Sequence, residues 1–448
     1  MKILQVVHSF PPENMAGTEI YTYNLSKELS KRNEVFVFYR ISDRKKREYE
    51  LSYDKFDGLN TITINNTFKF CDSFEKFYRN DAIDQQFARV LDGIKPDVVH
   101  IQHFIFLSTA IIQEIKKRGI PVVLSLHDYW LICPQWHFLR KDLGICNDID
   151  AFECVDCLDY QLSIKKIPKS IYVRFRNIMP EFVTSFLKKM YLNIAKADLN
   201  SLDTPEKVKL RVKHIKELSS QVDLFIAPSQ FLRSKFIEFG IPEDKTRFLS
   251  HGINTECFKG FKRRPSDRIR FGFIGTILPA KGVDILIEAF NKFKDERIEL
   301  KLYGRLFPYR GFEYYPGYIK RLIRNKKIKF MGGFDHKNVS NVFSEIDVLV
   351  FPSIWNENCP LVILEAFVTK TPVIASRVGG IPELIKDKEN GLLFELRNPE
   401  DLYEKIKTFI NDPGLIERLR GGIDLPKSIQ ENAKEIEELY ARVTDVKK

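Results

Sequence analysis

The sequence lacks any segment long and apolar enough to cross a membrane as a helix. No uninterrupted apolar run approaches about 18 residues, and Met1–Val7 has the pattern of a first β-strand rather than of a signal peptide. Seven cysteines, an odd number, stand without an export signal, which argues against a disulfide framework. We therefore expect a cytoplasmic protein whose fold does not depend on disulfides.

The chain is also too long for a single compact core. Its 448 residues, 44% of them hydrophobic and 29% charged, predict two folded domains rather than a disordered chain. Lysine and arginine (71) exceed aspartate and glutamate (60), for a net charge of +11. This excess favours phosphorylated ligands, nucleic acid or an anionic membrane surface, and charge alone does not separate the three.

Short apolar runs alternate with helical patterns, which predicts an α/β protein with parallel sheets. The pattern starts afresh after the basic stretch at 259–267, so we expect two doubly wound, Rossmann-like domains facing each other across a cleft. We place the first domain at 1–258, the second at 259–425, and a C-terminal helix that packs back toward the first domain at 426–448. An insertion in the first domain, at about 129–218, is irregular and cysteine-containing at first and then basic and helical.

The expected elements of the two domains follow this alternation. Strands are predicted at 3–7, 34–39, 97–102 and 121–126 in the first domain and at 269–274, 298–303, 328–331, 347–351 and 372–375 in the second, with helices at 19–30 and 108–118. The carboxyl ends of the strands should meet at the cleft, where open α/β sheets bind their ligands.

The segment at 353–366 follows a predicted buried strand and carries two carboxylates. We expect a helix to begin near Pro360, because proline suits a first helical turn and Asn358 is the nearest good capping side chain. The free backbone N–H groups of this helix would face the cleft and offer a phosphate site. Glu357 in the loop and Glu365 in the helix could then hold hydroxyls of two sugar rings, one on each side of a diphosphate.

A longer pattern surrounds these carboxylates, beginning at Phe334. It reads Phe-Asp-His-Lys, Asp-Val-Leu-Val-Phe-Pro-Ser, two glutamates separated by seven residues, Thr-Pro-Val-Ile-Ala-Ser, Gly-Gly-Ile-Pro-Glu and Asn-Gly-Leu-Leu-Phe. End to end, this resembles the donor-binding signature of the retaining glycosyltransferases of family 4 (glycosyl transferases group 1), which have the two-domain GT-B fold. The resemblance spans almost the whole chain.

The resemblance implies transfer of a sugar from a nucleotide-diphosphate-sugar to a hydroxyl acceptor, either a sugar or a lipid-linked saccharide. By it, the second domain binds the donor and the first lies on the acceptor side. Glu365 should bind the ribose hydroxyls, and Glu357 should hold the donor sugar as a catalytic residue. The diphosphate should meet the backbone of the five residues before and within the helix start, namely Asn358, Cys359, Pro360, Leu361 and Val362.

Lys281 lies in the loop after the first strand of the second domain, where the resemblance implies a cation that neutralises the leaving diphosphate. The alternative is an ordinary surface lysine at a helix start. Many relatives carry arginine just after Gly275, whereas this chain has Thr276 at that donor-side position. Arg305 and Arg310 are the candidates to replace the missing cation.

Two loops of the first domain complete the expected site. Gly17 and Thr18 lie between the first strand and its helix, where relatives carry a glycine loop near the donor phosphate and the acceptor, and glycine permits close backbone approach. His127 follows another strand, and in relatives the matching histidine touches the donor sugar. Asp128 is placed on the acceptor side. The alternatives are a turn without a ligand role and a loop histidine satisfied by its neighbours.

The catalytic chemistry implied by the resemblance is electrostatic and independent of metal. An Asp-x-Asp string, Asp148 to Asp150, lies in the insertion and not after a strand, so we read it as chance. Lys281 and a helix N-terminus should stabilise the departing diphosphate. In this family the leaving phosphate is thought to help deprotonate the acceptor, so no protein base is required. Glu357 and His127 would orient the sugar.

Four cysteines gather in the irregular stretch: Cys133, Cys146, Cys154 and Cys157. The last two have the spacing of half a zinc knuckle. Some relatives resemble this chain in a His-Asp-x-Trp-x-x-Cys-Pro run followed by further cysteines. A structural zinc ion, a disulfide and buried free thiols are all open at this stage.

The segment at 164–196 carries eight lysines and arginines against the single acid Glu181, interleaved with aromatic residues. This mix suits an interfacial helix on anionic lipid, which would place the protein peripherally on the inner face of the cytoplasmic membrane. The alternative is a solvated basic face on an ordinary packed helix pair. No nucleic-acid partner is expected, because no recognised nucleic-acid module accompanies the charge.

Two rival functions stand beside the transferase. One is a nucleotide-sugar-binding regulator that has lost catalysis, which Thr276 makes conceivable. The other is a GT-B nucleotide-sugar epimerase, which the two glutamates separated by seven residues disfavour. Because Glu357 and Lys281 are both present, we expect an enzyme that builds a surface polysaccharide or a glycolipid.

Overall fold

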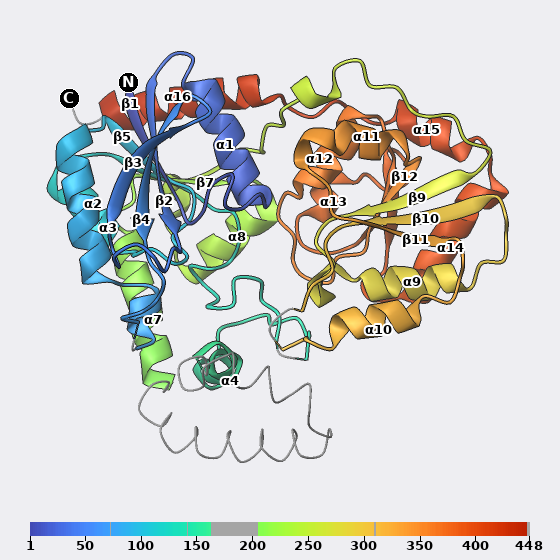
Figure 1. Ribbon diagram of the computed structural model, residues 1–448, viewed down its shortest axis with the longest axis horizontal. Helices are drawn as coiled ribbons and strands as arrows, with labels where there is room; N and C mark the ends of the chain where they lie inside the picture. The colour runs from blue at the N-terminus through green and yellow to red at the C-terminus, as the bar shows by residue number, and fades with distance from the viewer. Residues whose placement is uncertain (72, 141, 163–204, 309–310, 446–448) are drawn as a thin grey trace.

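The computed structural model describes residues 1–71, 73–140, 142–162, 205–308 and 311–445. These residues form two β-sheets with helices on their faces, arranged side by side along the long axis of the molecule (Figure 1). Buried apolar side chains cover both faces of each sheet, as in a doubly wound α/β architecture. The predicted basic segment at 164–196 lies outside the described residues. Within the described ranges, no helix is long and apolar enough to cross a membrane.

The first sheet has eight strands in the order β3-β4-β2-β1-β5-β6-β7-β8, and every neighbouring pair except β3–β4 is parallel. The strands are β1 (Lys2–Val7), β2 (Glu34–Ile41), β3 (Leu51–Phe56), β4 (Leu59–Asn65), β5 (Val98–Ile101), β6 (Val122–Ser125), β7 (Leu224–Ala227) and β8 (Thr246–Phe248). The helices connected to this sheet are α1 (Gly17–Leu29), α2 (Asp81–Ile94), α3 (Ile111–Lys117), α4 (Ala151–Leu162), α7 (Pro205–Ser219) and α8 (Gln230–Phe239).

The second sheet has six parallel strands in the order β11-β10-β9-β12-β13-β14. They are β9 (Ile269–Ile274), β10 (Ile298–Tyr303), β11 (Ile328–Gly332), β12 (Val348–Phe351), β13 (Val373–Ser376) and β14 (Gly391–Phe394). Its helices are α9 (Val283–Asn291), α10 (Tyr315–Leu322), α11 (Val339–Ser344), α12 (Leu361–Val368), α13 (Ile381–Leu384), α14 (Pro399–Asn411) and α15 (Leu415–Gly421). Short 3₁₀ turns lie at η1 (Glu75–Phe77), η2 (Glu243–Lys245), η3 (Glu256–Phe258), η4 (Pro279–Lys281) and η5 (His336–Asn338).

The central strands are apolar throughout because helices cover both of their faces. All residues of β5, β6, β7, β12, β13 and β14 are buried. Capping residues fix the helix limits between them. Asn80 accepts hydrogen bonds from the N–H groups of Ala82 and Ile83 at the start of α2. Ser229 caps α8, and Gly240, with a φ of 108°, ends it in the left-handed conformation.

The C-terminal helix α16 (Ile429–Asp445) returns to the first sheet, although the chain leaves that sheet near residue 250 (Figure 1). The Tyr440 hydroxyl lies 3.0 Å from Gln5 Nε2 and 2.6 Å from His100 Nδ1, both inside the first domain. On the surface, Glu437 pairs with Arg32, in the turn between α1 and β2, at 2.7 Å. The helix thus forms part of the core of the first domain.

The structure differs from the sequence-based expectations in several details, and strands β8 and β14 are among the elements that were not predicted. The antiparallel β3–β4 hairpin was not predicted; Asp57 and Gly58 form its turn with φ angles of 47° and 80°. The stretch expected to be irregular contains α4, whose start is capped by Asp150 Oδ1, an acceptor for the N–H groups of Phe152 and Glu153. The expected capping of α12 by Asn358 is wrong, because Pro360 occupies the cap position and no side chain caps that helix.

Candidate active site

The loop between β12 and α12 owes its shape to two glycines that press against it. Gly379 has a φ of 58°, and a Cβ there would lie 2.3 Å from the carbonyl oxygen of Glu357. A Cβ on Gly380 would lie 2.3 Å from the carbonyl oxygen of Asn358. The Gly380 N–H also donates to the Glu357 carbonyl at 2.6 Å. Only glycine allows this approach, so the loop is held in one position.

Glu357 lies at the centre of this loop with its side chain 6% exposed. Its Oε1 accepts hydrogen bonds from Lys281 Nζ (2.6 Å), Ser353 Oγ (2.8 Å) and Trp355 Nε1 (2.6 Å). All three donors meet Oε1, and no described residue donates a hydrogen bond to the other carboxylate oxygen, Oε2. The carboxylate is therefore fixed in orientation and keeps one oxygen for a further hydroxyl.

Lys281 reaches Glu357 from the last residue of η4, directly after β9. The following Gly282 has a φ of 62°, and a Cβ there would lie 2.0 Å from the carbonyl oxygen of Pro352, so the two loops touch backbone to backbone. The ammonium group also lies 5.6 Å from the ring centroid of Phe351 and 5.3 Å from that of Trp355. The structure thus brings the two predicted catalytic charges of the second domain into direct contact.

Glu365 lies in the middle of α12, the helix that directly follows this loop, and is buried. Its Oε1 lies 2.6 Å from Nε2 of His336 in η5. Burial would lower the pKa of His336, but the hydrogen bond and the charge of Glu365 outweigh it and raise that pKa. Sequence reasoning quoted His336 within the Phe-Asp-His-Lys motif but gave it no role; the structure makes it the partner of the predicted ribose ligand.

His127 lies at the carboxyl end of β6 in the first domain and is half-buried. Its Nε2 lies 2.8 Å from Gln102 Oε1, and its ring stacks on His251 with a centroid separation of 5.1 Å. Burial, followed by the neighbouring histidines, lowers the pKa of His127 well below its usual value. A neutral imidazole whose Nε2–H donates to Gln102 presents Nδ1 as a hydrogen-bond acceptor.

The two domains meet at this histidine. Asn358 Nδ2 donates to the carbonyl oxygen of His127 at 2.9 Å. Nearby, both carboxylate oxygens of Glu383 accept backbone N–H groups at the start of α8, from Gln230 and Phe231, each at 2.7 Å. The β12–α12 loop of the second domain and the loop after β6 in the first are therefore joined by a hydrogen bond.

Several buried polar atoms near the strand ends of the first domain lack a hydrogen-bond partner among the described residues. They are His8 Nδ1, Glu19 Oε2, Tyr129 OH and, across the domain contact on the β12–α12 loop, Asn358 Oδ1. His8 Nε2 lies 3.0 Å from Glu19 Oε1. Buried polar atoms without partners are rare in folded proteins. Their presence beside the predicted acceptor loops is consistent with groups that bind a polar ligand.

Three other predicted residues, Gly17, Thr18 and Asp128, lie in the first domain and do not join the Lys281–Glu357 contact. Gly17 is exposed as the first residue of α1, where a Cβ would meet nothing within 4 Å. Thr18 follows it, and its carbonyl accepts the Thr22 hydroxyl at 2.7 Å. Asp128 accepts a hydrogen bond from the Trp130 N–H and lies 3.0 Å from His103 Nε2.

Thr276 and Arg305 are exposed on adjoining loops, joined by a hydrogen bond from the Ile277 N–H to the Arg305 carbonyl at 3.0 Å. Arg305 is thus near the position that lacks arginine, while Arg310 lies outside the described residues. Among the predicted backbone contacts for the diphosphate, Pro360 has no N–H to give, and the N–H groups of Leu361 and Val362 lie in the first turn of α12.

Two family descriptions match the sequence. Residues 255–436 match glycosyl transferases group 1, and residues 15–155 match glycosyltransferase family 4. The chain belongs to glycosyltransferase family 4. Similar proteins include an uncharacterized glycosyltransferase of Methanocaldococcus jannaschii, 31% identical over 229 residues that cover 50% of this chain and 58% of that protein. D-inositol 3-phosphate glycosyltransferase of Streptomyces bingchenggensis is 30% identical over 249 residues, covering 51% and 54%.

The matched regions span little more than half the length of these two relatives. Among solved structures, that of Anabaena HepE in complex with UDP and glucose has a TM-score of 0.67 at 17% identity, covering 99% of this chain and 100% of that one. This likeness shows the fold. The family 4 chain therefore has the GT-B architecture, with two Rossmann-like domains, that the sequence predicted.

Proposed function

We propose that this family 4 protein is a retaining glycosyltransferase that moves a sugar from a nucleotide-diphosphate-sugar to a hydroxyl acceptor. The observation that carries the proposal is the 2.6 Å contact between Lys281 and Glu357 beside the start of α12. The loop that holds Glu357 is hydrogen-bonded to the first domain through Asn358. A lysine and free helix N–H groups suit a diphosphate, whereas a fixed carboxylate suits a sugar hydroxyl. A site that combines the phosphate-binding groups with the sugar-binding carboxylate suits a ligand that contains both a diphosphate and a sugar.

In the proposed reaction, the bond from the anomeric carbon to the diphosphate breaks while the acceptor oxygen attacks the same face of the sugar. The leaving diphosphate takes the proton of the acceptor hydroxyl, so retention needs no protein base. Lys281 and the N–H groups of Leu361 and Val362 stabilise the negative charge that develops on the diphosphate. Glu357 and neutral His127 orient the sugar and steady its positive charge. Glu365 holds the ribose, and no metal is required.

UDP-sugars are the first donors to test, because a structural neighbour, Anabaena HepE, is in complex with UDP and glucose. For the acceptor we propose a lipid-linked saccharide that is extended into a surface polysaccharide or a glycolipid. The basic and aromatic sequence at 164–196 supports this choice, because such a sequence suits an anionic membrane surface. The enzyme would then act peripherally, on the inner face of the cytoplasmic membrane.

The test measures nucleotide release from UDP-, GDP- and ADP-sugars, with and without polyprenyl-linked acceptors. Acceptor-dependent release, with the donor's anomeric configuration kept in the product by NMR, supports the proposal. Binding without release under every condition supports the inactive regulator, and interconversion of the donor sugar without transfer supports the epimerase. Glu357→Gln should abolish transfer, while Glu400→Gln, a surface ion-pair variant of the same domain, should not.

Membrane association has its own test. Sedimentation with anionic vesicles should carry down more protein than sedimentation with neutral vesicles, and the difference should shrink at high salt. Equal partitioning to both kinds of vesicle would refute an electrostatic membrane role without affecting the transferase proposal.

A further inference from the structure

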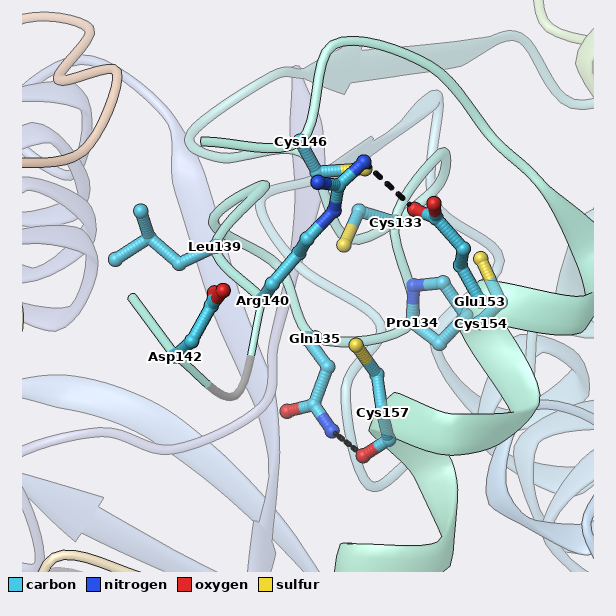
Figure 2. Close-up of a pocket in the computed structure, with 10 residues that line it drawn as sticks. All are labelled: Cys133, Pro134, Gln135, Leu139, Arg140, Asp142, Cys146, Glu153, Cys154 and Cys157. Carbon is cyan, nitrogen blue, oxygen red and sulfur yellow. Dashed lines mark hydrogen bonds and ion pairs between the residues drawn. The ribbon is translucent and has the colours of Figure 1, made fainter. Parts of the chain in front are cut away.

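A pocket outside the Lys281–Glu357 site is lined by all four cysteines of the insertion. The cavity, about 340 Å³, lies between Cys133 and Cys146 on the segment after β6 and Cys154 and Cys157 on α4 (Figure 2). Because Cys154 and Cys157 are three residues apart on one helix, they share a face. All seven cysteines of the chain are thiols in the structure.

Three of these cysteines, Cys133, Cys146 and Cys154, are partly buried and pack against the core of the first sheet. The Gln135 side chain donates a hydrogen bond to the Cys157 carbonyl at 2.6 Å, which joins the segment after β6 to α4 (Figure 2). The fold thus brings four cysteines to one pocket from three separate positions of the insertion.

A buried cation beside the pocket has no carboxylate partner among the described residues. Arg211 of α7 is 2% exposed, and its guanidinium donates only to backbone carbonyls just before Cys133, those of Trp130, Leu131 and Ile132. Buried charges are normally paired, so an uncompensated guanidinium at this place indicates an anionic group nearby.

A second cation lines the pocket itself. Arg140 forms an ion pair with Glu153 at 2.8 Å (Figure 2). A zinc ion bound by four thiolates carries two negative charges in total. Arg211 would offset part of this charge, whereas four neutral thiols or a disulfide would leave Arg211 uncompensated.

We propose that Cys133, Cys146, Cys154 and Cys157 form a structural tetrathiolate zinc site. Four cysteine ligands are typical of structural zinc, and binding releases the thiol protons. In the part of the chain that the structure describes, no three histidine, cysteine, aspartate or glutamate side chains yet stand at metal-binding geometry. Zinc must therefore draw the four sulfurs inward, and Cys146 must give up the hydrogen bond that its thiol donates to the Asp148 carbonyl at 2.8 Å.

The site has a structural consequence because the segment between Cys133 and Cys146 crosses to the second domain. Leu139 is buried in the core of the second sheet, and Leu143 and Ile145 pack against the same core. Arg397 donates a hydrogen bond to the Leu143 carbonyl. Cys133 and Cys154, in contrast, pack against the core of the first sheet. Zinc thus anchors a strap, residues 138–146, that ties the two domains together.

The first experiment measures zinc and iron in the full-length protein purified under reducing conditions. We expect about one zinc per chain. Cys154→Ser and Cys157→Ser should lower the zinc content severalfold, while Cys257→Ser, a matched control outside the pocket, should leave it unchanged. Zinc below about a tenth of an equivalent, iron in its place, or two fewer titratable thiols in the unfolded protein would overturn the proposal.

The second experiment does not depend on the folding of any variant. Chelator is added to the wild-type protein, and hydrogen exchange is followed before and after zinc is returned. Amides of the strap, such as those of Arg140 and Cys146, which bond to the carbonyls of Gly144 and Phe138, should exchange faster without zinc and recover with it. Unchanged exchange in the strap after complete metal removal contradicts the proposal. Cobalt substitution should give the thiolate charge-transfer bands of a tetrahedral site, and their absence counts against it equally.

Discussion

Replacing Lys281 by methionine removes the charge from the proposed donor site while keeping a side chain of similar length. In the structure, Lys281 Nζ donates to Glu357 Oε1 at 2.6 Å, and the two side chains are 26% and 6% exposed. After the change, Ser353 and Trp355 remain as neutral donors to the same oxygen. Glu357 therefore keeps its orientation but loses its counter-charge.

The magnitude follows from these contacts. Breaking a buried ion pair costs about 3–5 kcal/mol. Because Lys281 is a quarter exposed and two donors stay on Oε1, we expect a loss of about 1–3 kcal/mol in the free energy of unfolding. Turnover should fall as well, because removing one group that stabilises developing charge lowers kcat by about 10²–10³.

The assay compares Lys281→Met with Lys292→Met, which removes a surface lysine paired with Glu400 in the same domain. We would measure kcat/KM with the donor found active in the nucleotide-release panel, the Kd of the matching nucleoside diphosphate by calorimetry, and the urea midpoint. Lys281→Met should weaken diphosphate binding and turnover together. Lys292→Met should change neither.

A double-mutant cycle makes the reasoning refutable. If Lys281 and Glu357 act as one unit, the effects of Lys281→Met and Glu357→Gln on stability and turnover should differ from additivity by about 1–3 kcal/mol. Turnover of folded Lys281→Met within about threefold of wild type would refute the electrostatic role. Strict additivity would refute the coupling, even if each variant were impaired.

Three further outcomes are expected. Gly379→Ala, with a φ of 58° and a Cβ 2.3 Å from the Glu357 carbonyl, should cost at least about 2 kcal/mol of unfolding free energy in urea titrations. Glu383→Ala, which removes the acceptors for the first N–H groups of α8, should cost about 1 kcal/mol, and Glu383→Gln should cost less. The pKa of His336 is raised above 6.5 by Glu365, so the stabilisation from this pairing should be complete below pH 6.5 and should disappear as the pH rises through the raised pKa. The urea midpoint of the wild type, measured relative to that of His336→Gln, should therefore fall over this pH range. A constant difference between the two midpoints contradicts the pairing.

Elements with strong local patterns could be predicted, and two of the details that were missed also had signals in the sequence. Buried strands such as β12 read as short apolar runs, and Pro360 correctly indicated where the next helix starts. The Asp57-Gly58 pair between apolar runs is the usual signature of a two-residue hairpin turn. Asp150 with Glu153 three residues later is the signature of a helix start, here of α4.

The remaining parts of the site depend on contacts between segments far apart in the chain. Asn358 was read as a local cap, but its amide instead reaches the His127 carbonyl, 231 positions away. The pairing of His336 with Glu365 likewise depends on η5 lying beside α12. Local propensity describes what a residue can do near its own position, and tertiary packing decides which of the available partners it meets.

The contact between Lys281 and Glu357 also explains how two charges can stay in a largely buried place. Alone, either charge would be destabilised by loss of hydration, so that it would become neutral or move into solvent. Together, with Ser353 and Trp355 on the same oxygen, they compensate each other and fix each other's position. A phosphate drawn to Lys281 and a hydroxyl drawn to Glu357 would replace one compensated arrangement by another. The pair can therefore be preorganised for a diphosphate-sugar without leaving an unpaired buried charge in either arrangement.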